Sequence, residues 1–444
     1  MQQGRTNMRL RSKRVVREFG VLWVLALTLT NSVAQVTPAP AGQVFDAYEP
    51  PNPTLVRPSE DPKRTVNGLA LTPPMGWNSW NKFACNVDEK LIRETADAMV
   101  SSGMKDAGYQ YVVIDDCWHG ERDAQGLIRP NAQRFPSGMK ALGDYIHAKG
   151  LKFGIYSDAG WKTCGGHPGS RGHEYQDAQT YASWGVDYLK YDWCNTDGLK
   201  AEGAYATMRE ALRAAGRPII FSICEWGDNK PWEWASNVGH LWRTTGDIYP
   251  CWDCEKNYGT WSAWGVMKIV DKQIPLRKYA GPGHWNDPDM MEVGNGLSNT
   301  EGRAHFSMWA MLAAPMMSGN DLRNMPAEIK AILTNKDVIA VGQDALGVEG
   351  FRAIEENGLE TWLKPLNDGG WAVCFLNRAD TAKTLDFSWK SQYMQDGLSN
   401  KELNAARDTY KIRDLWTGKD LGTTASNLKA SIQSHDVLML RLTR

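Results

Sequence analysis

The chain has 444 residues, a formal net charge of −1 and 23% charged residues, which is an ordinary composition for a soluble globular protein. A chain of this length can hold more than one domain. The nearly balanced charge gives no basic surface for binding nucleic acid, so the composition argues against that class of partner.

Residues 1–34 have the pattern of a secretory signal peptide. Six basic residues lead into an apolar run at 21–27, and the Ser-Val-Ala at 32–34 offers the small residues that a signal peptidase needs. The apolar run is too short for a stable membrane-spanning helix, so a membrane anchor is the weaker interpretation. Cleavage after Ala34 removes six basic residues and one acidic residue, which lowers the net charge from −1 to −6. We therefore expect an exported protein, periplasmic or extracellular, without stable membrane insertion.

The cysteines and histidines do not follow a metal-binding pattern. Eight cysteines suit an oxidising compartment, and Cys251-Trp-Asp-Cys254 is best interpreted as a small local disulfide. The eight histidines form no H-x-H or H-E-x-x-H pair. The sequence therefore predicts neither a metal site nor a cofactor.

Residues 35–68 contain seven prolines and lack apolar periodicity, so we expect a linker or a surface arm. A repeating unit begins after them, in which a short β-rich run ends in polar or acidic residues and a helical segment follows. The eight runs end at or lead to Asn78, Asp115-Asp116, Asp158, Asp192, Glu225, Asp247, Asp287-Asp289 and Met317. The seventh of these runs is expected around Tyr279-Ala280.

The segments between these runs have helical spacing, with apolar residues at intervals of three and four in residues 92–104 and 139–146. Short apolar strands that alternate with helices are typical of a parallel sheet that is buried on both faces. Eight such units close into a (β/α)₈ TIM barrel, which we assign to residues 69–345.

The helical pattern ends after residue 345. Strand-like runs at 361–364, 370–376, 411–416 and 436–440 are separated by turn residues. We therefore expect an antiparallel β-sandwich over residues 346–444.

Acidic residues collect where the barrel strands end. The active site of a TIM barrel lies at the C-terminal ends of its strands, and six of the eight runs carry an acid there. One such Asp can simply cap the following helix, which is the role we expect for Asp158. Helix capping does not explain six of them.

Glycoside hydrolysis generally needs two carboxyl groups, and the strand ends offer suitable candidates. Asp192 has Lys190 two residues earlier on the same face of its strand, and a nearby cation keeps a nucleophilic carboxylate ionised. Asp247 follows the flexible Gly246 and is a candidate for a residue that alternates between acid and base.

Further candidates fit sugar binding. Asp115 and Asp116 together offer several acceptors for the adjacent hydroxyls of one sugar. Trp77 can stack on the apolar face of a pyranose ring. The residues alone thus favour an exported carbohydrate-active enzyme without identifying its sugar.

Seven segments, in register over residues 69–345, resemble the α-galactosidases of glycoside hydrolase family 27, also called melibiases. The segments are 71–80, 115–118, 154–160, 189–192, 224–226, 243–247 and 285–290. The resemblance implies a barrel followed by a β-sandwich. It also implies a retaining exo-glycosidase that hydrolyses terminal non-reducing α-D-galactosyl residues of oligosaccharides or polysaccharides by double displacement.

The resemblance also implies roles for individual residues. Asp192 matches the nucleophile, Asp247 the acid/base, and Asp115 and Asp116 the pair that binds the 4- and 6-hydroxyls of galactose. Glu225 matches the position that reads the 2-hydroxyl. Further substrate-binding positions are matched by Trp77, Tyr156, Lys190, Arg243 and Asp289. The implied disulfides are Cys85–Cys117 and Cys164–Cys194, and Cys224 lacks the partner that some relatives provide.

Three alternatives stay open. An α-N-acetylgalactosaminidase uses smaller residues at the position of Glu225, and a β-L-arabinopyranosidase acts on a sugar without the 6-hydroxymethyl group that Asp116 would bind. The third alternative is an inactive galactose-binding protein, against which the intact Asp192 and Asp247 argue. Residues 249–254 and His284 depart from the family pattern, and the sequence does not identify the natural aglycone or the oligomeric state.

Overall fold

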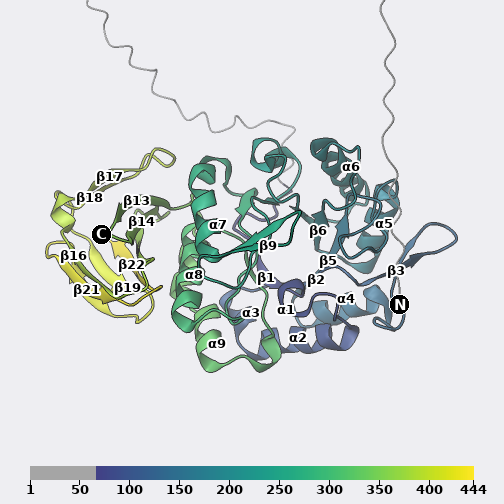
Figure 1. Cartoon of the computed structure of the whole chain (residues 1–444), viewed down its shortest axis with the longest axis horizontal. Coiled ribbons are helices and arrows are strands. Elements are labelled where there is room, and N and C mark those ends of the chain that lie inside the picture. Colours follow the sequence, from purple (N-terminus) through teal and green to yellow (C-terminus); the bar gives the residue numbers. More distant parts are fainter. Residues whose placement is uncertain (1–66) are drawn as a thin grey trace, which may run out of the picture. The chain divides into compact units, whose positions relative to one another are not determined.

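The computed structural model describes residues 67–444, so the predicted signal peptide and nearly all of the Pro-rich segment lie outside the described residues. Eight parallel strands form one sheet in the order β11-β8-β7-β6-β5-β2-β1-β12 (Figure 1). A parallel bridge between Met291 and Ser318 joins the segment after β11 to β12, so the two edges of the sheet meet. The strands are β1 (Met75–Asn78), β2 (Tyr111–Ile114), β5 (Lys152–Asp158), β6 (Tyr188–Asp192), β7 (Ile220–Ile223), β8 (Leu241–Arg243), β11 (Trp285–Asp287) and β12 (Met316–Ser318). The predicted barrel is confirmed.

Helices connect the strands and surround the barrel (Figure 1). The α-helices are α1 (Trp80–Phe83), α2 (Glu89–Ser101), α3 (Met104–Ala107), α4 (Gly138–Ala148), α5 (Glu174–Trp184), α6 (Ala201–Ala214), α7 (Val266–Gln273), α8 (Asn299–Met311), α9 (Ala327–Leu333) and α10 (Lys336–Gly342). The 3₁₀ helices are η1 (Pro231–Glu233), η2 (Ala235–Asn237), η3 (Ile274–Tyr279), η4 (Leu322–Asn324) and η5 (Trp389–Ser391). The apolar period at 92–104 belongs to two helices, because Gly103 adopts a left-handed φ of 86° between α2 and α3.

The seventh strand does not lie where the sequence suggested. Tyr279 ends the 3₁₀ helix η3, and a turn over residues 281–284 separates it from β11. This turn contains Pro282 between two glycines, which explains why the strand begins only at Trp285. Two short hairpins project from loops of the barrel: β3 (His119–Arg122) with β4 (Ile128–Pro130), and β9 (Glu255–Asn257) with β10 (Ser262–Trp264).

The C-terminal part is an antiparallel β-sandwich, as predicted. One sheet has the order β13-β14-β15-β22-β19-β20, and the pairs β16–β21 and β17–β18 complete the fold. The strands are β13 (Phe351–Glu356), β14 (Leu359–Pro365), β15 (Trp371–Asn377), β16 (Lys383–Phe387), β17 (Tyr393–Gln395), β18 (Glu402–Asn404), β19 (Lys411–Asp414), β20 (Asp420–Thr423), β21 (Leu428–Ile432) and β22 (Val437–Thr443).

The central strand β15 is buried on both faces. Val373 and Phe375 belong to the sandwich core, where the Phe375 ring meets that of Phe387 at 4.9 Å. Ala372 and Cys374 point the other way and join the main hydrophobic core, which includes Trp309 of α8. The indole N–H of Trp309 donates to the backbone oxygen of Asp289 at 2.8 Å, so α8 connects this face of the sandwich with a strand end of the barrel.

Within residues 67–444, no helix combines the length and the apolar character that crossing a membrane requires.

Candidate active site

A cavity with about 420 Å³ of empty space opens among the C-terminal strand ends of the barrel. Eight of the ten predicted catalytic and binding residues line it: Asp115, Asp116, Tyr156, Lys190, Asp192, Arg243, Asp247 and Asp289. The same cavity is lined by five residues that the sequence analysis did not select as catalytic or sugar-binding: Trp80, Asn81, Cys164, Trp226 and Met290. Parallel strands bring their C-terminal ends to one edge, which explains why acids from separate repeats meet here.

Asp115 is the carboxylate that holds the buried lysine of the site. Its Oδ2 accepts hydrogen bonds from Lys190 Nζ at 2.9 Å and from Asn78 Nδ2 at 2.7 Å. The Asp115 backbone N–H in turn donates to Ser79 Oγ. Burial acts to lower the pKa of Lys190, but neighbouring negative groups, Asp115 foremost and Asp192 with it, together raise the pKa well above its ordinary value. Lys190 is therefore a fixed cation in the cavity.

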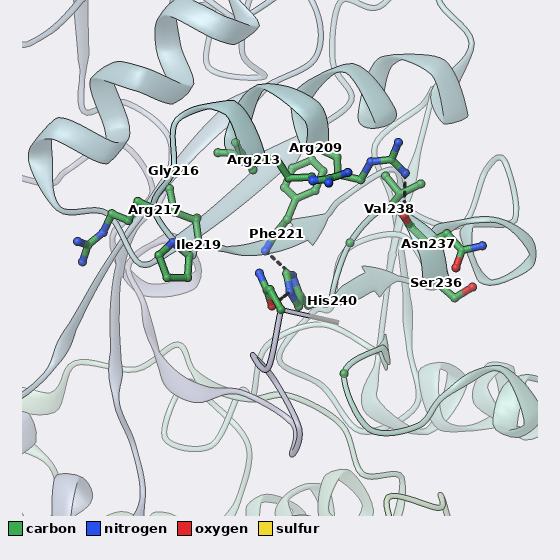
Figure 2. Close-up of a pocket in the computed structure, with 15 residues that line it drawn as sticks. Arg209, Arg213, Gly216, Arg217, Ile219, Phe221, Ser236, Asn237, Val238 and His240 are labelled. Carbon is green, nitrogen blue, oxygen red and sulfur yellow. Dashed lines mark hydrogen bonds between the residues drawn. The ribbon is translucent and has the colours of Figure 1, made fainter. Parts of the chain in front are cut away.

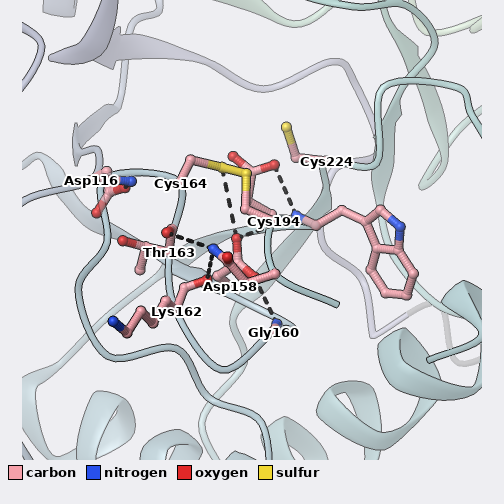
Figure 3. Close-up of a disulfide and its surroundings, with 12 residues drawn as sticks. Asp116, Asp158, Gly160, Lys162, Thr163, Cys164, Cys194 and Cys224 are labelled. Atoms are coloured by element: carbon pink, nitrogen blue, oxygen red, sulfur yellow. Dashed lines mark hydrogen bonds between the residues drawn. A yellow bond between two sulfur atoms is a disulfide. The ribbon is translucent and has the colours of Figure 1, made fainter. Parts of the chain in front are cut away.

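Asp116 is positioned by two loops. Its Oδ1 accepts the backbone N–H of Cys117 at 2.6 Å, and its Oδ2 accepts that of Gly165 at 2.7 Å. Burial raises the pKa of Asp116. The structure contains the disulfides Cys85–Cys117 and Cys164–Cys194, so both of these loops are covalently tied down. The Cys164–Cys194 bond and the neighbouring Asp116 are visible in Figure 3.

Asp192 lies at the base of the cavity and is only 5% exposed. Its Oδ1 accepts the backbone N–H of Trp193 at 2.9 Å. Burial raises its pKa to about 6, Lys190 opposes this rise, and the charges of Asp247 and Asp115 add to it. A carboxyl group with this pKa is largely ionised at neutral pH, as a nucleophile requires.

Asp158 pairs with Asp192 in the register of β5 and β6. The expectation that it caps a helix is wrong, because α5 begins only at Glu174 and its N-cap is His173. The Asp158 carboxyl instead accepts the backbone N–H groups of Gly160 at 2.7 Å and Cys194 at 3.0 Å (Figure 3). Burial, reinforced by the charge of Asp192, raises its pKa to about 9. Asp158 is thus a neutral connector between two loops.

Arg243 connects the acids on the other side of the cavity. Its Nη2 contacts Asp289 Oδ2 at 2.7 Å and Asp247 Oδ1 at 3.0 Å. Asp289 also accepts the backbone N–H of Ile248 at 2.9 Å, which ties it to the loop of Asp247. The Asp247 side chain is 41% exposed, so it lies where the cavity opens to solvent.

Trp77 does not lie at the cavity. It is wholly buried in the main core, and its indole N–H donates to the backbone oxygen of Asn320 at 2.7 Å. Side chains alternate along β1, so Asn78 reaches Asp115 inside the barrel while Trp77 points outward. Trp80, at the start of α1, is the tryptophan of this segment that lines the cavity.

Glu225 is not among the residues that line the cavity. It is fully buried, and its Oε2 accepts two hydrogen bonds from the backbone and side chain of Asn229. Burial raises its pKa to about 7 against these hydrogen bonds. The neighbouring Cys224 accepts a hydrogen bond from Arg243 Nη1 at 3.7 Å, and Trp226 lines the cavity. The cavity lining at this point includes Trp226 and not Glu225, and the role of Glu225 toward the 2-hydroxyl stays a prediction.

A different groove, with about 1290 Å³ of empty space, lies at the opposite ends of strands β7 and β8. Figure 2 shows Arg209, Arg213 and Arg217 on one side of it and His240 on the other. Its lining contains no carboxylate, and the His240 ring accepts the backbone N–H of Phe221 at 3.0 Å. The groove therefore lacks the paired acids of glycoside hydrolysis.

Two side-chain clusters in residues 67–444 have ligand atoms within 4.8 Å of one another, as a metal site would. They consist of Asp116, Cys117 and His167, and of Asp158, Cys164 and Cys194. All three of these cysteines are in disulfides, so they offer no thiolate to a metal ion. The clusters are better understood as the disulfide anchors of the cavity.

A TIM barrel whose strand-end cavity holds several carboxylates, with one buried and another open to solvent, has the architecture of a glycoside hydrolase. The comparisons define the family. Residues 72–344 match the model of alpha galactosidase A, and residues 356–442 match that of the alpha galactosidase C-terminal beta sandwich domain.

Individual relatives agree. The alpha-galactosidase A of Cellvibrio japonicus is 62% identical over 374 residues, which are 84% of this chain and 92% of the relative. Among solved structures, alpha-galactosidase I from Mortierella vinacea has a TM-score of 0.79 at 39% identity and covers 85% of this chain and 98% of its own. The α-galactosidase from Saccharomyces cerevisiae with raffinose has a TM-score of 0.78 at 31% identity, with coverages of 85% and 98%. The chain belongs to the melibiase family of α-galactosidases, glycoside hydrolase family 27.

Proposed function

We propose that the enzyme is a retaining exo-α-galactosidase in which Asp192 is the nucleophile and Asp247 the acid/base. The observation that carries the proposal is the meeting of these two acids in one cavity, one buried and one 41% exposed. A nucleophile acts from below the sugar ring, whereas an acid/base must reach the leaving oxygen and then the incoming water. The exposures of the two carboxyl groups fit these different tasks.

In the first step, Asp192 attacks C1 of the galactosyl group and forms a covalent glycosyl-enzyme, while Asp247 protonates the departing oxygen. In the second step, Asp247 accepts a proton from water, whose oxygen attacks C1 and releases galactose and Asp192. Each attack inverts C1, so the product keeps the α configuration. Asp115, Asp116 and Lys190 offer acceptors and donors for the hydroxyls of the sugar.

Substitution separates the two roles. Asp192→Asn and Asp247→Asn should each lower kcat on an aryl α-galactoside by about 10³-fold or more, while Asp197→Asn, an exposed site five residues after Asp192, serves as the matched control. Azide should partly rescue Asp192→Gly and yield β-galactosyl azide, since it attacks C1 directly. Azide should also rescue Asp247→Gly, but with α-galactosyl azide as the product, because in this variant azide attacks C1 of the glycosyl-enzyme. Near-normal turnover in Asp192→Asn would refute the assignment.

The stereochemistry can be read directly. Proton NMR of an early reaction mixture should reveal α-galactose before mutarotation produces the β anomer. If β-galactose appears first, the enzyme inverts and the double displacement is wrong.

The preferred sugar is proposed to be unsubstituted galactose. Trp226 lines the cavity where the sequence reasoning had placed Glu225, and its bulk opposes an acetamido group on the 2-position. Aryl glycosides of galactose, N-acetylgalactosamine and β-L-arabinopyranose separate the three activities, and galactose should be cleaved fastest. Trp226→Ala should raise the activity on the N-acetylgalactosaminide relative to that on the galactoside. The α-galactosidase structure with raffinose supports a galactosyl oligosaccharide as a substrate class.

Export is the last part of the proposal. The three disulfides within residues 67–444 are consistent with an oxidising compartment. Expression of the full chain should give an exported protein whose N-terminal sequence begins at Gln35. A cell-associated protein that keeps residues 1–34 would contradict this prediction.

A further inference from the structure

We propose that the β9–β10 hairpin carries a binding subsite for the sugar chain of the leaving group, formed by Tyr258 and Trp261. The inference rests on the proposed function, because it takes Asp247 as the group that protonates the leaving oxygen. It adds to that function the place where the leaving group of a long, neutral oligosaccharide or polysaccharide would bind.

The base of the hairpin is fixed to the catalytic loop. The backbone N–H of Trp264 donates to the Asp247 oxygen at 2.9 Å, and that of Tyr249 donates to the Trp264 oxygen at 2.8 Å. The disulfide Cys251–Cys254 closes the intervening turn. The end of β10 is therefore hydrogen-bonded to the backbone of the residue that faces the leaving group.

The tip of the hairpin presents two aromatic rings to solvent. Tyr258 and Trp261 are 47% and 49% exposed, and their rings stack with centroids 4.4 Å apart and planes 19° from parallel. The Tyr258 N–H donates to the Trp261 oxygen at 2.9 Å, which closes the turn between them. Among the large apolar side chains that are exposed in residues 67–444, this is the pair whose rings stack on each other.

Stacking uses one face of each ring and leaves the other face free. Each of the two residues is about half exposed, so part of its surface is open to a ligand. The flat apolar face of an aromatic ring suits the C–H face of a pyranose. Exposed apolar area beside an active site is a common mark of ligand binding.

The spacing and the charges favour a neutral sugar chain. Trp261 directly precedes β10 and lies three residues from Trp264, about 10 Å at 3.3 Å per residue of extended chain. This is about the length of a disaccharide beyond Asp247. Charges of both signs lie along the hairpin: Glu255 and Lys256 are exposed, and Lys268 pairs with Glu255 at 3.8 Å. The exposed pair of rings is thus not part of a patch of one sign.

Kinetics with short and long leaving groups test the subsite. For Trp261→Ala we expect kcat/KM on a galactosylated mannan oligosaccharide to fall about fivefold, mainly through KM, with the Tyr258→Ala, Trp261→Ala double variant lower still. The aryl α-galactoside should be cleaved at an unchanged rate, since its leaving group does not reach the tip. Tyr393→Ala, which removes a 54% exposed tyrosine of the sandwich, is the matched control. Trp261→Tyr should keep most of the activity on the long substrate.

Two outcomes overturn the inference. An equal loss on both substrates would mean that Trp261 only supports the fold around Asp247, and an unchanged rate on the long substrate would mean that the rings do not bind it. Direct binding of an ungalactosylated mannan oligosaccharide to the wild-type enzyme and to Trp261→Ala completes the test. This measurement does not depend on catalysis, so a failure of the subsite can be distinguished from a failure of the proposed mechanism.

Discussion

Replacement of Asp158 should destabilise the barrel next to the catalytic carboxylates. Asp158 is wholly buried and accepts the backbone N–H groups of Gly160 and Cys194, which follow neighbouring strands. Asp158→Ala leaves both N–H groups without their partner, and each buried unsatisfied donor costs about 1–3 kcal/mol. We therefore expect the free energy of unfolding to fall by about 2–6 kcal/mol. Asp158→Asn keeps one acceptor, so the loss should be about half as large.

Because Asp158 is protonated in the folded state, the loss of stability on its replacement should depend on pH. Its pKa is about 9 in the folded chain, against an ordinary value of 3.8, so between these pH values the folded state holds a proton that the unfolded state releases. Its contribution to stability is fully present below pH 3.8 and decreases as pH rises toward 9. Asn does not titrate. Asp158→Asn should therefore be more destabilised relative to wild type at pH 5 than at pH 8.

Denaturant unfolding at the two pH values measures both effects, with Asp197→Ala as an exposed control. If the Asp158→Ala variant is as stable as the wild-type enzyme, Asp158 does not act as a connector between the two loops. A separate check is the pH profile of kcat/KM. A neutral Asp158 does not influence the charge of Asp192, so Asp158→Asn should leave the acid limb in place. A limb that moves to lower pH would mean that Asp158 is ionised in the wild-type enzyme.

Two further predictions concern the same region. The pKa of Asp192 is about 6, so kcat/KM should decrease below about pH 6 as the nucleophile takes up a proton. Lys190→Met removes the cation that lowers this pKa, so the acid limb of the pH profile should move to higher pH. An acid limb that stays in place would contradict the influence of Lys190 on Asp192. A Cβ at Gly160 would lie 2.0 Å from the backbone oxygen of Cys194, so Gly160→Ala should lower both the melting temperature and the activity. Gly203→Ala in α6, where a Cβ meets open space, should leave both unchanged or raise stability slightly, as scanning calorimetry can check.

The sequence predicted the parts of the fold that repeat. Short apolar runs that end in polar or acidic residues locate seven of the eight barrel strands, because parallel burial demands the same pattern in each unit. The strand at Trp285–Asp287 escaped because its three residues are preceded by a 3₁₀ helix whose Tyr279 looks equally strand-like. Edge strands of the sandwich such as β17 were not predicted, since half-exposed residues leave little apolar periodicity.

Two of the predicted sugar-binding residues are not part of the cavity lining. Trp77 and Glu225 each belong to a matching motif, yet Trp80 and Trp226 are the residues at the cavity. A motif identifies a strand end but not the direction of each side chain. The pleat of β1 turns Trp77 outward, whereas Trp80 lies in α1, and Glu225 and Trp226 lie in the loop after β7. In β1 the choice was visible in principle, because Asn78 and Asp115 must share the interior if they are to bond.

Contacts made by loops could not be inferred in this way. Gly165 reaches Asp116 only because the segment after β5 folds back over the cavity, where the Cys164–Cys194 disulfide holds it. Nothing in the spacing of these residues sets that path. The same holds for the β9–β10 hairpin, whose base bonds to Asp247 although Trp264 lies 17 residues further along the chain. The strand ends supply acids in a fixed arrangement, whereas the loops decide which atoms of a long substrate can lie beside them. Differences in leaving group among enzymes with this barrel should therefore depend on such hairpins more than on the carboxylates.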